Sequence, residues 1–317
     1  MNYRHAYHAG NFADVLKHTV LFALIEALQA KSTPFCFIDT HAGSGSYALD
    51  GFEAGKTGEY KDGIARLHPA EKVPALLQRW RASILQAPGN ESGLKIYPGS
   101  PLQVARMLRP GDSAQLCELH PDEAARLRQL FHGNRQVHVH ERDGYAALKA
   151  LLPPAQKRGL VLIDPPYEAQ EAEYKIVAAA LKTALQRWPS GIFALWYPIK
   201  LRSQVQPFLH GLQRSPAQRV LRAEILLHAD DTPLRLNGAG MVILNAPWNL
   251  DDVLREPLRA LAGLLGHIGP ARWTLDWLRQ EGAEPPEPSP LPPSRLAHLR
   301  AAGAVQTPHT PRRRGSR

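Results

Sequence analysis

Cysteine is scarce in this chain of 317 residues, which has only Cys36 and Cys117, each inside an apolar run. Two such thiols argue against a disulfide framework or a cysteine metal site and favour buried, reduced side chains in the cytosol. No stretch approaches the roughly 18 consecutive apolar residues of a membrane helix. The opening sequence MNYRHAYHAG also lacks the apolar core of a secretion signal. We therefore expect a cytoplasmic protein without a membrane segment.

Acidic residues are outnumbered: 29 Asp and Glu face 38 Lys and Arg, which gives a formal net charge of +9. A surplus of this sign favours a polyanionic partner such as nucleic acid. The segment 281–317 holds 8 prolines, 6 arginines and 3 glutamates, so it supplies only +3 of that charge. With few large apolar side chains, this segment is expected to be a disordered Pro/Arg-rich tail. The basic character therefore belongs mainly to the part expected to fold.

Apolar residues make up 44% of the chain, enough for a sheet that is buried on both faces. Continuous apolar runs predict five buried parallel strands, at 35–39, 114–118, 137–141, 160–164 and 192–197. Helical patterns separate most of them, at 121–131, 145–152 and 171–187. Two further runs, 223–228 and 240–245, are expected to form an antiparallel pair that ends the sheet. The alternation predicts the α/β class with a doubly wound, mostly parallel sheet.

The first helix is predicted at 13–30, where leucine and valine recur every fourth residue. Asn11 is a suitable N-cap, since an acid, Asp14, lies in the first turn that follows. Asp14, Lys17 and His18 share one face of this helix at positions i, i+3 and i+4. A polar face is therefore expected at the beginning of the helix, ahead of its apolar stripe.

A glycine turn follows the first predicted strand in FIDTHAGSGSY, residues 37–47. Gly43 and Gly45 would let the backbone approach a bound nucleotide without a Cβ in the way. This signal is weak alone, because Gly43 to Ala48 also fits a loose dinucleotide-binding pattern. The next acid at a strand end, Glu118, lies far beyond the turn. We therefore predict a core of 1–50 and 111–280 with an inserted, mainly helical subdomain at 51–110, including a helix at 70–87.

The most specific motif is LVLIDPPYE, residues 160–168, which places Asp-Pro-Pro-Tyr at the carboxyl end of a buried strand. Sheets of this class bind their ligands at that edge. An adenine N6 amine is a poor nucleophile that must become pyramidal and lose a proton to attack a methyl sulfonium. The Asp164 carboxylate and the Pro165 carbonyl can accept its two hydrogens in that geometry, and Tyr167 can stack on the extruded base. The motif predicts methylation of an amine, with Asp164 as the catalytic residue.

With these motifs in hand, the chain resembles the bacterial large-subunit 23S rRNA adenine-N6 methyltransferase J family. The resemblance rests on segments that occur in order between about residues 3 and 275: YRHAYHAGNFADVLKHT, DTHAGSGSY, TGEYKDGIARL, YPGSPL, ELHP, RDGY, LIDPPYE, ALWYPI and GAGMVILNAPW. It implies a Rossmann-like class I methyltransferase that adds one methyl group to N6 of a 23S rRNA adenine. The implied cofactor is S-adenosylmethionine, and no metal takes part. The Pro/Arg-rich tail lies outside the matched region.

The resemblance also implies roles for individual residues. Asp164 carries over as the catalytic residue, and Tyr3 as a contact to the RNA, with His5 and Lys17 as further substrate-side candidates. Glu118 would bind the ribose hydroxyls, and Asp143 would accept from the cofactor's adenine amine. The implied cofactor-binding positions are His18, His41, Ser100, Glu118, Asp143, Gly144 and Asp164. The expected substrate is rRNA that is naked or early in assembly, bound by a monomer.

Three other functions compete with this interpretation. An NAD-dependent oxidoreductase could use the glycine turn, but the region that should hold its second strand, GFEAGKTGEYKDG, is predicted to be a loop. A DNA adenine-N6 or protein amide methyltransferase could use the same Asp-Pro-Pro-Tyr site. A non-catalytic RNA-binding protein could keep the fold, although an intact Asp164 argues against it.

Overall fold

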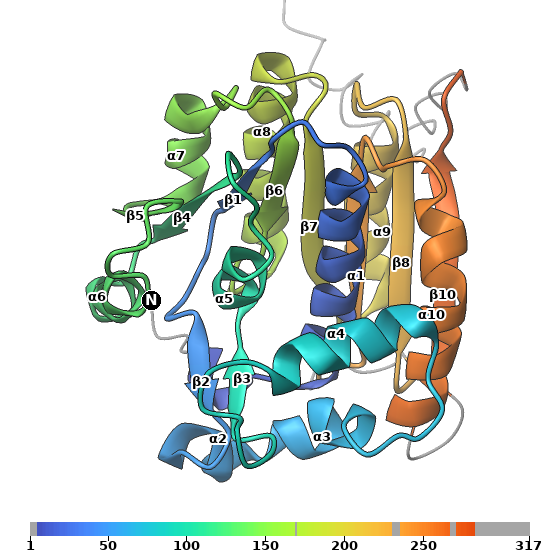
Figure 1. Cartoon of the computed structure of the whole chain (residues 1–317). Helices are drawn as coiled ribbons and strands as arrows, with labels where there is room; N and C mark the ends of the chain where they lie inside the picture. Colours follow the sequence, from blue (N-terminus) through green and yellow to red (C-terminus); the bar gives the residue numbers. More distant parts are fainter. Residues whose placement is uncertain (1–4, 169, 230–234, 267–270, 283–317) are drawn as a thin grey trace, which may run out of the picture. The chain divides into compact units, whose positions relative to one another are not determined.

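The computed structural model describes residues 5–168, 170–229, 235–266 and 271–282 (Figure 1). The region Met1–Ala283 forms one compact unit, to which the following description refers. Tyr3 and nearly all of the predicted tail, from residue 283 onward, lie outside the described residues. No helix in the described part of the chain is both long enough and apolar enough to cross a bilayer.

An eight-stranded sheet forms the centre, in the order β10-β8-β9-β7-β6-β1-β4-β5. Neighbouring strands from β7 to β5 run parallel, whereas β9 runs antiparallel to both β7 and β8. The strands are β1 (Cys36–Asp39), β4 (Ser113–Glu118), β5 (Val137–Glu141), β6 (Gly159–Ile163), β7 (Ile192–Ile199), β8 (Val220–Leu226), β9 (Gly238–Leu244) and β10 (Arg272–Arg279). The predicted α/β class with a mostly parallel sheet is confirmed.

The end of the sheet differs from the prediction. The two late strands do pair antiparallel, but each begins earlier than predicted, at Val220 and Gly238. They do not end the sheet, because β10 pairs antiparallel with β8 and forms the edge. In the sequence of β10, RWTLDWLR, large apolar residues alternate with polar ones, and this period of two is typical of a half-buried strand.

Helices cover both faces of the sheet, as a doubly wound fold requires. One core cluster lies beneath α1 (Phe12–Gln29), α5 (Ser100–Ala105), α6 (Pro121–Leu130) and α10 (Leu250–Leu265). The second cluster lies on the other face, beneath α7 (Gly144–Leu151), α8 (Gln170–Arg187) and α9 (Arg202–Gln213). The helices predicted at 13–30, 121–131, 145–152 and 171–187 are confirmed, with ends that differ by one residue at most.

Helix α1 is buried on nearly all sides, because it contacts β9, α10, α4 and α5 (Figure 1). Asn11 caps it as predicted, since its Oδ1 accepts from the amides of Ala13 and Asp14, both at 3.0 Å. The polar residues of the first turns are buried as well: Asp14 is 3% exposed and Lys17 is 4% exposed. The polar face of the helix therefore points into the protein, where it must find partners.

The segment 51–110 holds α2 (Phe52–Thr57), the 3-10 turn η2 (Glu59–Asp62), α3 (Ile64–Leu67), α4 (Ala75–Leu85), β3 (Ile96–Pro98) and α5. The prediction of a loop in GFEAGKTGEYKDG was wrong, because α2 and η2 form there. The glycine turn leads into a short strand, β2 (Ser46–Ala48), which pairs with β3. Helix α4 is shorter than the predicted helix at 70–87. The separate status of an inserted subdomain stays a prediction.

Candidate functional site

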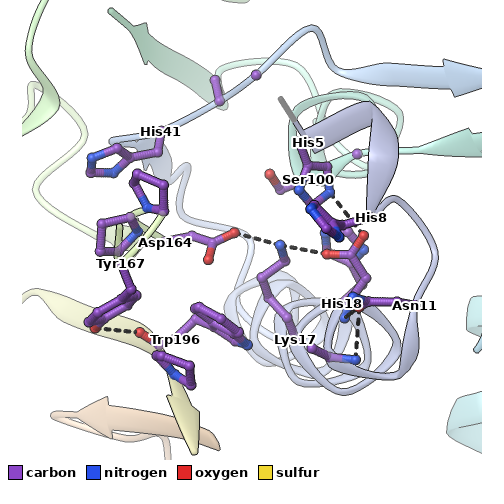
Figure 2. Close-up of a pocket in the computed structure, with 18 of the residues that line it drawn as sticks. His5, His8, Asn11, Lys17, His18, His41, Ser100, Asp164, Tyr167 and Trp196 are labelled. Carbon is purple, nitrogen blue, oxygen red and sulfur yellow. Dashed lines mark hydrogen bonds and ion pairs between the residues drawn. The ribbon is translucent and has the colours of Figure 1, made fainter. Parts of the chain in front are cut away.

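A cavity of about 350 Å³ lies at the carboxyl ends of four adjacent strands (Figure 2). Glu118 ends β4, His41 follows β1 and Asp164 follows β6, while Trp196 lies on β7; all four line the cavity. Helix α1 closes another side with residues of its first turns. The volume falls in the range of small-molecule pockets, and the position is the edge where sheets of this type bind ligands.

Asp164 reaches this cavity from the turn that follows β6. Its side chain is 16% exposed, and Pro165 and Pro166 line the cavity next to it. Tyr167 adopts a left-handed backbone conformation, with φ at 49°, and its hydroxyl donates to the Trp196 carbonyl at 2.9 Å. This bond connects the motif to β7. Tyr167 lines the cavity, although the residue is only 7% exposed.

Lys17 joins the catalytic candidate to helix α1. Its Nζ lies 2.5 Å from Asp164 Oδ2 and 2.7 Å from Asp14 Oδ1. Asp14 Oδ2 in turn lies 2.9 Å from His5 Nε2 and accepts from the Gly10 amide at 2.9 Å. In Figure 2, dashed lines connect Asp164 to Lys17 and continue toward His5. The sequence predicted that Asp14 and Lys17 share a polar helix face, but it did not reveal that His5 and Asp164 join them in one chain of contacts.

In the chain of contacts from His5 to Asp164, burial and neighbouring charges shift the pKa values in opposite directions. Burial alone would raise the pKa of the Asp14 carboxyl, but His5 and Lys17 outweigh it and hold that pKa well below its ordinary range. Burial would likewise lower the pKa of the Lys17 amine, but the two aspartates outweigh it and raise the pKa. Lys17 is therefore a charged group with fixed partners, and its geometry suits it to hold the Asp164 side chain in place.

The glycine turn and Glu118 form the opposite end of the cavity. Glu118 accepts from the Gly43 amide at 2.8 Å and from the His120 amide at 2.7 Å, so both of its oxygens are oriented by backbone. Gly43 has φ at 61°, a conformation that favours glycine. Burial lowers the pKa of His41 to about 4, which leaves its ring neutral at physiological pH. Carboxylate oxygens held in this way can accept from ligand hydroxyls.

His18 and Ser100 lie between these two ends, and each has a buried partner. His18 Nδ1 lies 2.6 Å from the Tyr97 hydroxyl, whereas its buried Nε2 has no hydrogen-bond partner among the described residues. Ser100 donates to Asp39 Oδ2 at 2.7 Å. A buried ring nitrogen without a partner costs free energy unless a ligand satisfies it. His18 therefore points to a polar ligand in the cavity.

Two predicted cofactor residues do not line the cavity. Asp143 is the N-cap of α7, where its Oδ1 accepts from the Tyr145 amide at 2.7 Å and the Ala146 amide at 3.2 Å. Gly144 is buried against the turn that follows β1. Both lie near the cavity without forming its wall, and the carboxylate of Asp143 is exposed. Of the remaining predicted positions, Tyr3 alone lies outside the described residues.

We expect Gly144→Ala to weaken cofactor binding and to destabilise the fold by about 1–3 kcal/mol. The added Cβ would lie 2.0 Å from the Thr40 carbonyl oxygen, so α7 must move away from the turn that carries His41. Thermal unfolding with and without S-adenosylmethionine measures both effects. Gly263→Ala is the matched control, because Gly263 lies in α10 with nothing within 4 Å of an added Cβ. This control should stabilise the protein by about 0.5–1 kcal/mol, and equal behaviour of both variants would contradict the prediction.

Asp39 behind Ser100 predicts a pH dependence of stability. Burial raises its pKa to about 7, although bonds from Ser100 and the His41 amide oppose the shift. The folded state therefore holds a proton that the unfolded state has lost, so stability falls as pH rises from about 4 to 7. Asp39→Asn mimics the protonated acid and should flatten this part of the profile, which denaturant unfolding at several pH values measures. An unchanged slope in the variant would exclude Asp39 as its source.

The order of the sheet and the position of the cavity define the class of the protein. The antiparallel β9 lies between β7 and β8, and the cavity opens over β4, β1 and β6, as in class I methyltransferases with a Rossmann-like core. The family model described as "Ribosomal RNA large subunit methyltransferase D, RlmJ" matches residues 32–279. The chain belongs to this family.

Individual relatives agree with this assignment. Ribosomal RNA large subunit methyltransferase J of Escherichia coli (strain K12) is 40% identical over 281 residues, which cover 89% of this chain and 100% of the relative. The protein of the same name from Haemophilus influenzae is 39% identical over 281 residues, which again cover 89% of this chain and 100% of the relative. A crystal structure of a Legionella pneumophila protein superposes with a TM-score of 0.77 at 35% identity, covering 85% of this chain and 98% of the other.

Proposed function

We propose that this protein transfers one methyl group from S-adenosylmethionine to the exocyclic N6 amine of an adenine in 23S ribosomal RNA. The observation that carries this proposal is the placement of Asp164, Pro165 and Tyr167 at the carboxyl end of β6, facing a cavity in a methyltransferase fold. Family membership supports a large-subunit rRNA substrate. The proposed substrate is naked or early-assembly rRNA in the cytoplasm, and the proposed active form is a monomer.

The cavity offers groups that fit S-adenosylmethionine at its β1 and β4 end. Glu118 would accept from the ribose hydroxyls, and His18 Nε2 would meet a polar group of the cofactor. His41, Ser100, Asp143, Gly144 and Asp164 complete the proposed cofactor set, and Asp164 is also the proposed catalytic residue. When bound, the cofactor supplies an electrophilic methyl group on a sulfonium. The remaining task of the protein is to present an amine in a reactive geometry.

Asp164 and Pro165 are assigned to that task. The Asp164 carboxylate and the Pro165 carbonyl would accept the two hydrogens of the adenine amine, which favours the pyramidal nitrogen of the transition state. Lys17 engages Oδ2 of Asp164, whereas Oδ1 accepts no hydrogen bond from the described residues. The amine proton would pass to this carboxylate as the new N–C bond forms. Tyr167 would contribute its ring to the base, since its hydroxyl is already bonded.

The substrate-side roles of His5 and Lys17 are best understood as positioning. Both residues contact Asp14, and Lys17 also holds Asp164, so the chain from His5 to Asp164 connects the beginning of α1 to the reacting group. Tyr3 precedes this region and is proposed to contact the RNA directly. The arrangement supports a site in which the N-terminal residues and the catalytic turn act together on the target base.

The decisive experiment is transfer of labelled methyl from S-adenosylmethionine to protein-free 23S rRNA, followed by nucleoside analysis of the digested product. N6-methyladenosine at one position supports the reaction and the substrate together. Transfer to DNA or to a protein amide, with none to RNA, would keep the cofactor and replace the substrate. Absence of transfer to all three would overturn the enzymatic proposal.

A further inference from the structure

The charge of the cavity is unsuited to a polyanion. Among the described residues, five carboxylates line it, from Asp14, Glu59, Glu118, Glu123 and Asp164, and two lysines do, Lys17 and Lys200. Lys17 is already bonded to two of the carboxylates. An RNA strand that inserts a nucleotide here meets a repulsive field unless another cation receives its phosphate.

The strand order indicates different sides of Asp164 for the cofactor and for the target nucleotide. The cofactor candidates Glu118 and His41 follow β4 and β1, on one side of Asp164, while β7 lies on the other side. In the β6–β7 register the last pair is Ile163 with Leu195, so the next residues along the two strands are Asp164 and Trp196. The end of β7 is therefore the part of the cavity wall that remains for the target nucleotide.

One face of β7 forms this wall. Trp196, Pro198 and Lys200 alternate along the chain, and all three line the cavity. Trp196 packs edge to face on Tyr167, with ring centroids 5.7 Å apart, and Figure 2 shows its side chain in the space between Tyr167 and Lys17. Lys200 lies four residues further on, about 13 Å along an extended chain. The row thus extends outward from the catalytic turn.

Lys200 has a fixed backbone and an available side chain. Asn237 holds the backbone, since its Nδ2 donates to the Lys200 carbonyl at 2.6 Å and its amide donates to the Ile199 carbonyl at 2.9 Å. Lys200 is half-buried, and its ammonium has no acidic partner within the described ranges. A cation held at a cavity wall without a counter-charge is suited to bind an anionic group.

We propose that Lys200 binds a phosphate of the target nucleotide itself, at the outer end of a subsite whose inner wall is Trp196. The inference rests on the proposed function, because it assumes an RNA nucleotide with its base at Asp164. An extruded base carries its ribose and phosphates away from the reacting amine. The row on β7 follows the same direction, from the base at Trp196 to the phosphate at Lys200.

The first test measures the affinity of RNA for the wild type and for Lys200→Ala at several salt concentrations. Loss of one phosphate contact should weaken binding roughly five- to tenfold at 0.1 M salt and reduce the salt slope by about 1. Lys200→Arg should restore the slope. Lys182→Ala removes an equal charge from an exposed position on α8 and should leave it unchanged. An unchanged slope in Lys200→Ala would overturn the proposal.

The second test assigns the contact to the target nucleotide. The RNA is the fragment in which the wild type forms N6-methyladenosine, made with a neutral methylphosphonate on the 5′ or the 3′ side of that adenosine, or at a remote position. At one of the two adjacent positions, the methylphosphonate should weaken binding to the wild type relative to the unmodified RNA. At the same position it should not weaken binding to Lys200→Ala, because the contact is already absent in that variant. If each adjacent methylphosphonate weakened binding to Lys200→Ala as much as it weakens binding to the wild type, the assignment would be refuted. Failure of the wild type to methylate the unmodified fragment would instead refute the proposed function.

Discussion

Asp164→Ala is expected to lose methyl transfer by at least 10²- to 10³-fold, roughly the effect of removing one group that stabilises developing charge. The variant should still bind S-adenosylmethionine, because the groups proposed to hold the ribose and the polar end of the cofactor lie on β4, α1 and the glycine turn. Lys17 keeps Asp14 as a partner at 2.7 Å, so the substitution does not leave a buried ammonium alone. The loss should therefore fall on the chemical step.

Single-turnover transfer to rRNA, together with calorimetric titration of S-adenosylmethionine, separates these effects. Asp252→Ala is the control, because Asp252 is an exposed acid on α10 and does not line the cavity. Asp164→Asn tests the charge alone, since the amide keeps the shape of the carboxylate. Full methyl transfer by Asp164→Ala would rule out the proposed catalytic role. If the variant lost cofactor affinity as strongly as it lost methyl transfer, Asp164 would be a cofactor-binding residue instead.

The buried parallel strands could be predicted from the sequence because a strand covered on both faces is a continuous apolar run. The run at 160–164 became β6, shifted by one residue, and Asp164 therefore lies just beyond the strand. The edge of the sheet was harder to predict, because β10 is half-buried and its apolar residues alternate with polar ones, so it forms no continuous apolar run. Short helices such as α2 were not predicted, because four to six residues are too few to show a helical periodicity.

The candidate site could be predicted where a residue lies in a motif at a strand end, as Glu118 and Asp164 do. The contacts between motifs could not. Lys17 and Asp164 are separated by 147 residues along the chain, and their side chains meet at 2.5 Å only because the fold brings both to the same cavity. The partnership of Asp39 with Ser100 has the same origin. No local pattern encodes such pairs, because they depend on how the whole sheet is ordered.

Asp14→Ala should reduce the free energy of unfolding by about 3–5 kcal/mol, the cost of removing one partner from a buried ion pair. Asp14 is 3% exposed, and its loss leaves Lys17, at 4% exposure, with Asp164 alone. The Gly10 amide and the His5 ring lose their acceptor as well. Denaturant unfolding measures the effect. Exposed pairs contribute much less, so Glu26→Ala, which breaks the pair with the half-exposed Arg79, should cost under about 1 kcal/mol.

The pH dependence distinguishes the charge of Asp14 from its packing. Because the folded pKa of Asp14 lies well below its ordinary value, its contribution is present above the unfolded pKa and is lost as pH falls through the folded pKa. The difference in stability between wild type and Asp14→Ala should therefore be largest near neutral pH and shrink in acid. A difference that stayed constant as the pH falls would attribute the loss to packing. Since Lys17 holds Asp164, the same variant should also slow methyl transfer under conditions in which it remains folded.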